Sequence, residues 1–295
     1  MSTLLRETTR EKGASRWSRA LVAIQRGHSS SGVPKGRDRV PFFCVHGAGG
    51  NVLNFRAISI GVDPAQPFYG LQASGVDGES APHDSVEAMA RAYLAEVRAF
   101  RAHGPYLLGG YSGGGLVAFE MARLLTIANE PVGLLALLDT YHPDTKLRRM
   151  TFATRIARLR EEGISYVVGA LRRRREDEKR ASDRRAIEGH RARGEIIPFE
   201  LRDLHLVEHF RAIARRYRPR PWSGRATLFR TRSIKPIYED PGPTYGWDRC
   251  ALGGVEIVEI PGDHRTMMHG TNARLLGRAL DTALERAQAD SISRA

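Results

Sequence analysis

The sequence predicts an α/β fold built on one mostly parallel sheet. Short apolar runs rich in Val, Leu, Phe and Tyr alternate along the chain with stretches of helical periodicity. Most of these runs lack polar alternation, which is typical of parallel strands that helices cover on both faces. With 295 residues, the chain is long enough for one large domain that carries an insertion.

Each element is predicted from its own pattern. The candidate strands are 20–25 at an edge, 40–45, 68–71, 106–108, 134–138, 226–229 and the more alternating 255–260. The clearest helix has Asp84 or Ser85 as its N-cap, and its apolar residues recur at steps of three and four from Val86 to Phe100. A similar pattern from Leu276 to Ala287 predicts a C-terminal helix.

A long segment without a convincing strand interrupts this alternation. It shows helical patterns at 152–159 and 204–213, so we expect a helical lid over the carboxyl edge of the sheet. The predicted organisation is a flexible segment 1–19, a first part of the core at 20–144, a lid at 145–220 and a second part of the core at 221–295.

Most of the net charge of +13 lies in the predicted lid. From Lys146 to Arg220 there are 22 Lys and Arg residues against 11 Asp and Glu residues. This excess favours an anionic partner. The cluster Arg172–Arg175 is followed by acidic residues, however, and is also typical of a solvated helix face.

The most informative motif is the run Gly110-Tyr111-Ser112-Gly113-Gly114, between an apolar strand and a strong helix former. A serine between glycines at a strand-to-helix turn is the pattern of a nucleophile elbow. The small neighbours permit a strained turn, and the helix N-terminus beside the Ser112 hydroxyl favours negative charge. A glycine-rich turn that only closes a strand–helix unit is the plainer interpretation, but the correct flanks on both sides favour a nucleophile.

A serine nucleophile needs a base, and the base needs an orienting carboxylate. After the last predicted strand, the turn Pro261-Gly262 would bring His264 back over the sheet edge toward Ser112. His269, near the start of a helix, is the alternative base. Three further histidines lie in the predicted lid: His190, His205 and His209.

The candidate acid is Asp139, which directly follows the predicted strand 134–138. A carboxylate on the first loop residue after a buried strand is well placed to reach an imidazole, although an aspartate there is also common as a turn residue. Asp240 and Asp248, in the loop after the next strand, are the competing acids.

Acyl transfer also needs two backbone amides that face the oxyanion. One candidate is the amide of Gly113, directly after the nucleophile. The other is Ala48, in the glycine-rich loop 45–50 after the first core strand. We expect His46 in that loop to have a structural role.

Together these motifs resemble the thioesterase domains of polyketide synthases and nonribosomal peptide synthetases, which are members of the α/β-hydrolase superfamily. The resemblance extends from about Leu21 to Leu284 and is weakest in the lid. The matching runs are 41–50, 68–72, 88–90, 104–114, 137–139 and 262–264. Asn129-Glu130 departs from the family pattern, because a glycine-containing turn is usual before the strand that bears the acid.

The resemblance implies Ser112, Asp139 and His264 as a catalytic triad, with the Ala48 and Gly113 amides as the oxyanion hole. It favours Asp139 because this family takes its acid one strand earlier than most α/β-hydrolases. It implies a thioesterase without a metal or a cofactor of its own, acting through an acyl-serine intermediate on chains that an acidic carrier protein presents on a phosphopantetheine arm.

Several questions stay open from the sequence. The oxyanion loop resembles that of a product-releasing terminal domain, but no attachment site of the Asp-Ser-Leu type for phosphopantetheine is evident, so a free-standing enzyme is also compatible with the sequence. Chain release and editing, hydrolysis and cyclisation, the acyl chain and the oligomeric state are all undecided. A general esterase or lipase of the same fold is the alternative. An anion-binding module without catalysis is more remote, because aromatic residues are not interleaved with the arginines.

The composition bears on location and partners. Cys44 and Cys250 are too few for a disulfide framework, which favours a reducing cytoplasm. No signal-peptide core and no apolar run of membrane-spanning length occur, so we expect no membrane partner. We also expect no nucleic-acid partner, because the aromatic residues are not interleaved with the arginines as a base-stacking surface requires.

Overall fold

The computed structural model describes residues 20–27, 39–78, 80–146, 164–233 and 239–293. The expected flexible segment 1–19 and the helical pattern at 152–159 lie outside these ranges.

Seven strands form the sheet. They are β1 (Leu21–Gln25), β2 (Phe42–Val45), β3 (Phe68–Leu71), β4 (Tyr106–Tyr111), β5 (Val132–Leu138), β6 (Ala226–Thr231) and β7 (Val255–Ile260). Their spatial order is β1-β3-β2-β4-β5-β6-β7. Only the edge strand β1 runs antiparallel to its neighbour β3, and the other pairs are parallel. All the carboxyl ends of the parallel strands therefore meet at one edge.

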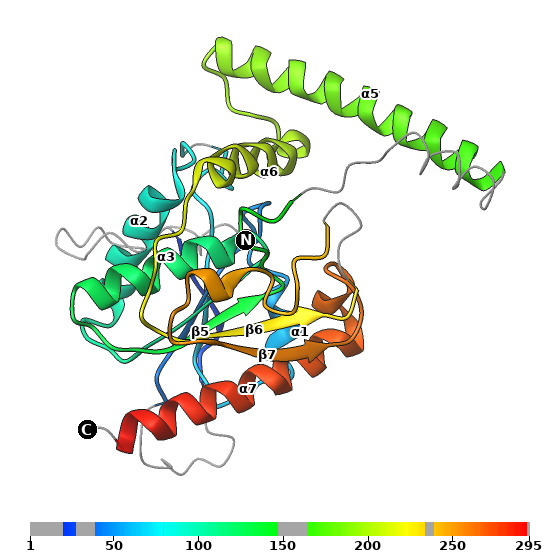
Figure 1. Cartoon of the computed structure of the whole chain (residues 1–295). Helices are drawn as coiled ribbons and strands as arrows, with labels where there is room; N and C mark the ends of the chain where they lie inside the picture. The colour runs from blue at the N-terminus through cyan, green and yellow to red at the C-terminus, as the bar shows by residue number, and fades with distance from the viewer. Residues whose placement is uncertain (1–19, 28–38, 79, 147–163, 234–238, 294–295) are drawn as a thin grey trace, which may run out of the picture.

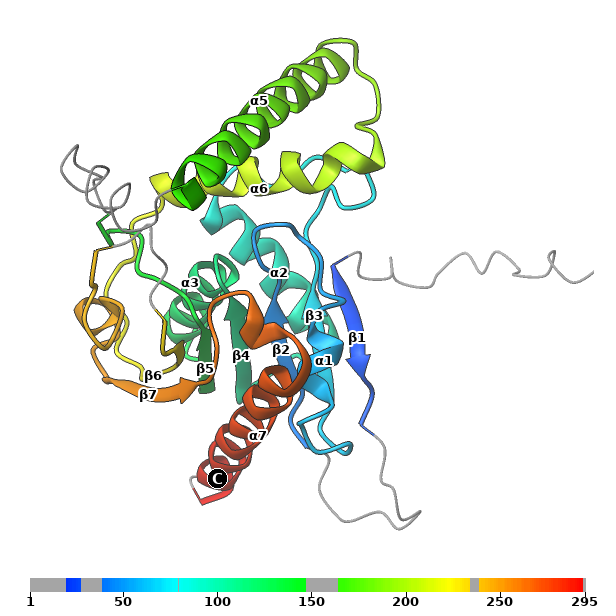
Figure 2. The same cartoon turned by 90° about the vertical axis from the view of Figure 1, so that its right-hand side faces the viewer.

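The described helices are distributed over both faces of the sheet. They are α1 (Phe55–Ser59), α2 (Val86–Phe100), α3 (Gly114–Ile127), α5 (Ile164–Ala192), α6 (Phe199–Arg216) and α7 (Gly270–Ser293), with 3-10 turns η1 (Trp247–Arg249) and η2 (Thr266–Met268). Helices α2 and α3 cover one face, whereas α1 and α7 cover the other (Figures 1 and 2).

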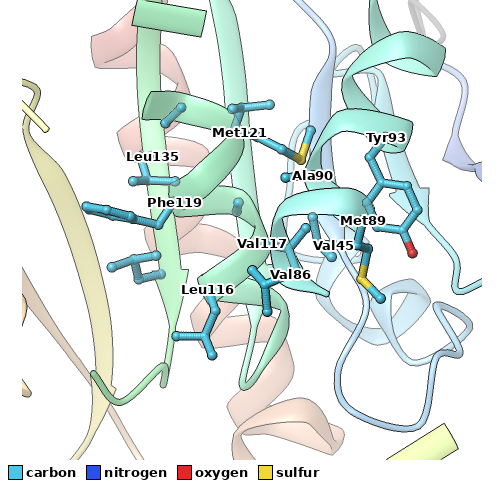
Figure 3. Packing of buried hydrophobic residues seen from close by; sticks show 14 of the residues in the cluster. Val45, Val86, Met89, Ala90, Tyr93, Leu116, Val117, Phe119, Met121 and Leu135 are labelled. Atoms are coloured by element: carbon cyan, nitrogen blue, oxygen red, sulfur yellow. The ribbon is translucent and has the colours of Figure 1, made fainter. Parts of the chain in front are cut away.

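The core has two layers because side chains alternate across each strand. In β2, Phe43 and Val45 pack under α2 and α3, whereas Phe42 and Cys44 pack toward α1 and α7. All four of these side chains are fully buried. Figure 3 shows the first layer, where apolar side chains of α2 and α3 meet between the helices and the sheet. This double burial explains why the central strands are apolar throughout.

The predicted elements are found, with shifted ends. The strands 68–71 and 255–260 and the helix 86–100 have the predicted bounds, and the Ser85 hydroxyl accepts a hydrogen bond from the Ala88 amide as an N-cap. β4 and β6 each extend beyond their predicted ends, to Tyr111 and Thr231. The mostly parallel sheet between two helical layers is the α/β-hydrolase fold that we predicted.

Helices α5 and α6 occupy the chain between β5 and β6. Helix α6 lies over the carboxyl edge of the sheet, and α5 lies beyond α6, away from the sheet (Figures 1 and 2). An ion pair between Arg184 of α5 and Glu208 of α6 joins the two helices, at 2.6 Å.

None of the described helices combines the length and the apolar character that crossing a membrane requires.

Candidate active site

Ser112 lies in the sharp turn between β4 and α3. Its φ of 54° is in the left-handed region, which is uncommon for a residue with a side chain. The Ser112 amide donates to the Leu138 carbonyl of the neighbouring strand at 2.8 Å, and this bond holds the turn against β5. Such strain persists only where the surrounding structure fixes the backbone.

The glycines around Ser112 are required by close backbone contacts. A Cβ on Gly110 would meet the backbone of Gly114 and Gly115, and a Cβ on Gly114 would meet the carbonyl oxygens of Val45 and His46. These atoms belong to the backbone and cannot rotate away. The small residues therefore let strand, turn and helix approach closely enough to form the elbow.

The structure brings His264 and Asp139 together although they are 125 residues apart in the chain. His264 Nδ1 lies 2.6 Å from Asp139 Oδ2, so the imidazole donates to the carboxylate. His264 follows Gly262, whose φ of 89° turns the chain back after β7. The Asp139 side chain has no exposed surface and the His264 side chain has 16%.

Asp139 is also held through its other oxygen. Oδ1 accepts hydrogen bonds from the Thr231 amide and the Thr231 hydroxyl at 3.0 Å each, and from the Tyr245 hydroxyl at 3.3 Å. Burial raises the pKa of Asp139, but the hydrogen bonds from His264 and Thr231 outweigh it and hold the pKa below its ordinary value. The carboxylate therefore stays ionised at neutral pH.

Tyr111, the neighbour of Ser112, holds His264 in place. Its hydroxyl donates to the His264 carbonyl at 2.6 Å, and its ring stacks on the imidazole with centroids 5.0 Å apart and an interplanar angle of 16°. The residue before the nucleophile thus contacts the base through two separate interactions.

The competing residues lie elsewhere. Asp240 accepts from the Gly242 amide and Asp248 accepts from the Thr244 hydroxyl, so neither is the carboxylate bonded to His264. His269 is exposed at the start of α7. Of the histidines in α5 and α6, His190 bonds to Glu195 and His209 bonds to the His83 carbonyl.

The Ala48 and Gly113 amides are available for a further hydrogen bond. In the part of the chain that the structure describes, neither amide donates to a backbone or side-chain acceptor. Gly113 is the N-cap residue of α3. Helix N-termini favour negative charge, so this edge suits a developing oxyanion.

His46 supports the loop that contains Ala48. It is 1% exposed, its Nδ1 donates to the Gly47 carbonyl at 2.5 Å, and its Nε2 lies 2.8 Å from the Tyr93 hydroxyl of α2. Burial lowers the pKa of His46 to about 4, so the imidazole is neutral near pH 7. These contacts give His46 a structural function, as we expected.

Helix α6 covers the two segments that carry these amides. A Cβ on Gly113 would meet the ring of Phe210, and a Cβ on Gly49 would meet the carboxylate of Asp203. The Phe210 ring also lies edge-on to His46, with centroids 6.2 Å apart. The contacts of α6 therefore reach the edge of the sheet at which Ser112, His264 and Asp139 lie.

Sequence reasoning missed four residues of this site: Tyr111, Phe210, Thr231 and Tyr245. The position of Tyr111 inside the elbow motif indicated a role in the site, since a large side chain beside Ser112 must pack against a neighbouring residue. Thr231 and Tyr245 gave no comparable signal, because their hydrogen bonds to Asp139 depend on how the chain after β6 folds back.

This arrangement combines a strained serine, an imidazole bonded to a buried carboxylate, the amide of Gly113 at the N-terminus of α3 and the amide of Ala48 in the loop after β2. Among the described residues, no group of three or more His, Cys, Asp or Glu side chains could hold a metal ion. The fold and this edge of the sheet define the α/β-hydrolase class. A family model described as "Thioesterase domain" matches residues 40–282. The chain belongs to this thioesterase family.

Curated relatives are similar to part or most of the chain. A dimodular nonribosomal peptide synthase of Bacillus subtilis (strain 168) is 28% identical over 84% of this chain and 10% of its own length. Indigoidine synthase of Dickeya dadantii (strain 3937) is 35% identical over 53% of this chain and 10% of its own length. Malpinin synthetase of Mortierella alpina is 44% identical over 36% of this chain and 1% of its own length. The chain thus spans a tenth or less of these relatives.

Solved structures share the fold. The NocB thioesterase domain from the nocardicin cluster superposes with a TM-score of 0.62 at 22% identity and covers 90% of this chain and 99% of its own. A four-domain nonribosomal peptide synthetase bound to AMP and glycine superposes with a TM-score of 0.63 at 22% identity, over 89% of this chain and 20% of that chain.

We predict that Gly114→Ala disrupts the elbow, because the new methyl group would meet two backbone carbonyls. Overpacking of this kind costs about 1–3 kcal/mol, so thermal unfolding should shift down and activity should fall. The matched control is Gly189→Ala in α5, where the nearest atom to a Cβ is Nη1 of the Arg193 side chain at 3.1 Å. That change should be neutral or slightly stabilising. Equal stability of the two variants would contradict the contact argument.

We predict that Asp139→Asn lowers kcat by about 10⁴-fold, as expected when an amide replaces the carboxylate that fixes the tautomer of a catalytic imidazole. The folded state should persist, because the amide oxygen can still accept from Thr231. The control is Asp240→Asn, at the exposed alternative acid, which should retain full activity. If kcat fell further in the Asp240→Asn variant than in the Asp139→Asn variant, Asp240 would be the acid that orients His264.

Tyr111→Phe keeps the ring on the imidazole and removes only the hydrogen bond to the His264 carbonyl. One hydrogen bond contributes about 1 kcal/mol, so kcat should fall roughly fivefold with little change in KM. The pH profile should keep its shape, since the base itself is unchanged. An altered KM with unchanged kcat would show that Tyr111 contacts substrate instead of positioning His264.

Proposed function

We propose that this enzyme cleaves acyl or peptidyl thioesters presented on the phosphopantetheine arm of a carrier protein, with Ser112, His264 and Asp139 as its triad. The observation that carries the proposal is the 2.6 Å hydrogen bond from His264 to the buried Asp139, at the same sheet edge as the strained Ser112. A serine without such a base is a poor nucleophile.

The first half of the reaction forms an acyl-enzyme. With Nδ1 bonded to Asp139, the imidazole accepts the Ser112 proton at Nε2 while the serine oxygen attacks the thioester carbonyl carbon. The Ala48 and Gly113 amides stabilise the oxyanion, where one lost donor typically costs about 3 kcal/mol of barrier. The C–S bond then breaks, and the protonated imidazole gives its proton to the departing pantetheine thiol.

The second half releases the chain. His264 takes a proton from a water molecule while the water oxygen attacks the carbonyl carbon of the acyl-serine. The ester bond then breaks, the imidazole returns the proton to the Ser112 oxygen, and the chain leaves as a free acid. An internal hydroxyl or amine of the acyl chain in place of water would give a macrocycle. The mechanism uses no metal and no cofactor of the enzyme.

The synthetase relatives support the choice of substrate. The relatives named above are a nonribosomal peptide synthase, indigoidine synthase and malpinin synthetase. The partner in this proposal is an acidic carrier domain in the cytoplasm. We further propose that residues 145–220 act as a lid, because α6 contacts Gly49 and Gly113.

Ser112→Ala should abolish the acyl-enzyme. Intact-protein mass spectrometry after brief incubation with an acylated carrier domain should show a mass increase for the wild type and none for the variant. Ser233→Ala, a serine in the loop after β6, is the control and should still acylate. Acylation of the Ser112 variant would remove this serine from the mechanism.

The same preparation separates a thioesterase from a general esterase. A thioesterase should have a higher kcat/KM for the carrier-bound thioester than for a p-nitrophenyl ester of the same acyl chain. A preference for the simple ester would favour the esterase.

A further inference from the structure

A concave, arginine-rich region lies between α2, α3 and the segment after α6. It is a hollow of about 190 Å³ whose charged lining is Arg91, Arg123, Arg218, Arg220, Glu87 and Glu120. We call these six residues the arginine groove. It adjoins a second hollow of about 330 Å³, which shares Glu87 and extends to Ser85 at the start of α2.

The two carboxylates of the groove offset only part of the charge of its four arginines. Glu120 is 3% exposed and is occupied by Arg123, through contacts of 3.0 and 2.6 Å, and by the Tyr217 hydroxyl at 3.1 Å. Arg218 donates to the backbone carbonyls of Arg215 and Tyr217, which carry no charge. The floor of the groove is thus a satisfied ion pair, and the surplus charge lies above it.

Together with Arg218, the residues Arg91 and Arg220 provide that surplus. Both side chains are exposed, and within the described ranges neither lies within ion-pair distance of a carboxylate. Four guanidinium groups face two carboxylates in one hollow. Such a concentration of one sign in a concave surface attracts anions and steers their approach.

The arginines of α5 differ in this respect. Arg172 pairs with Glu176 at 3.7 Å and Arg174 with Glu178 at 3.0 Å, each at a spacing of four residues along the same helix. Exposed pairs of this kind are typical of a solvated helix face. The richest run of arginines in the sequence is therefore partly neutralised by its own helix, whereas Arg91, Arg218 and Arg220 of the groove have no ion-pair partner among the described residues.

The groove also lies at a useful distance from the nucleophile. Glu120 follows the first residue of α3, Gly114, by six residues, which corresponds to about 9 Å at the rise of an α-helix, and Ser112 lies in the turn just before that helix. At the rim, Arg216 at the end of α6 donates to the Asp84 carbonyl at 3.2 Å. A partner in the groove would thus lie beside α6 and within reach of Ser112 for an extended pantetheine arm.

We infer that the arginine groove is the docking surface for an acidic segment of the carrier protein, whose carboxylates pair with Arg91 and Arg220. This inference rests on the proposed function and adds the place where the carrier binds. Complementary charge at such a surface raises the rate of encounter more than it changes the chemical step. The consequence should therefore be confined to substrates that a carrier presents.

The test compares two forms of one substrate, an acyl group on a peptidyl carrier domain and the same acyl group on free pantetheine. The double reversal Arg91→Glu and Arg220→Glu should lower kcat/KM for the carrier-bound form by about tenfold or more and leave the pantetheine thioester within about twofold of wild type. Added salt should weaken the wild-type preference for the carrier and should hardly affect the double variant.

Two control variants carry the same change in charge. Arg274→Glu with Arg278→Glu alters exposed residues of α7, on the opposite face of the sheet, and should change neither rate. Arg174→Glu with Arg175→Glu alters α5 and should also leave both rates near wild type. A selective loss in either control with none in the groove variant would overturn the inference, as would equal losses on both substrates in the groove variant.

Binding separates this inference from the proposed function. Fluorescence anisotropy of a labelled carrier domain with the Ser112→Ala protein measures docking without turnover. Weaker binding in the groove variant supports the docking surface, and unchanged binding overturns it. If wild type hydrolyses neither thioester yet the groove still binds the carrier, the proposed chemistry fails and the docking surface stands.

Discussion

The hydrogen bond between His264 and Asp139 is the interaction on which the rest of this site depends. A fully buried carboxylate is costly unless hydrogen bonds stabilise its charge, and here Thr231 and Tyr245 complete the set of donors. The bond also joins the loop after β5 to the turn after the edge strand β7, across the intervening strand β6. The same hydrogen bond therefore orients the His264 imidazole and connects the loops at this edge of the sheet.

The elbow at Ser112 meets this pair through backbone and ring contacts. The Ser112 amide bonds to Leu138, next to Asp139, and the Tyr111 ring lies on His264. The glycines of the motif make this proximity possible by leaving space for the carbonyls of β2. Helix α6 then closes over the edge, with Phe210 against Gly113. Changes in α6 can thus reach Gly113 without touching Ser112, His264 or Asp139.

The fold and the principal residues were predictable because their signals are local. Three short patterns each predict a turn at the end of a strand: a serine between glycines, a histidine after Pro-Gly and an aspartate after an apolar strand. Because the strands are parallel, these ends meet at one edge of the sheet. Thr231 and Tyr245 could not be predicted, since their contacts with Asp139 arise only after the chain has folded. The charge run at Arg172–Arg175 drew attention in the sequence, but ion pairing along α5 reduces its importance. The arginine groove is formed by residues from three segments that are far apart in the chain, so no single stretch of the sequence could predict it.

The central claim is that Ser112, His264 and Asp139 act on one carbonyl carbon. The most direct measurement is a crystal structure of the enzyme after reaction with an alkyl fluorophosphonate. We expect the phosphorus on the Ser112 oxygen, a phosphonyl oxygen held by the Ala48 and Gly113 amides, and His264 still bonded to Asp139. A phosphonate on another residue, or an imidazole turned away from Ser112 in the adduct, would contradict the account.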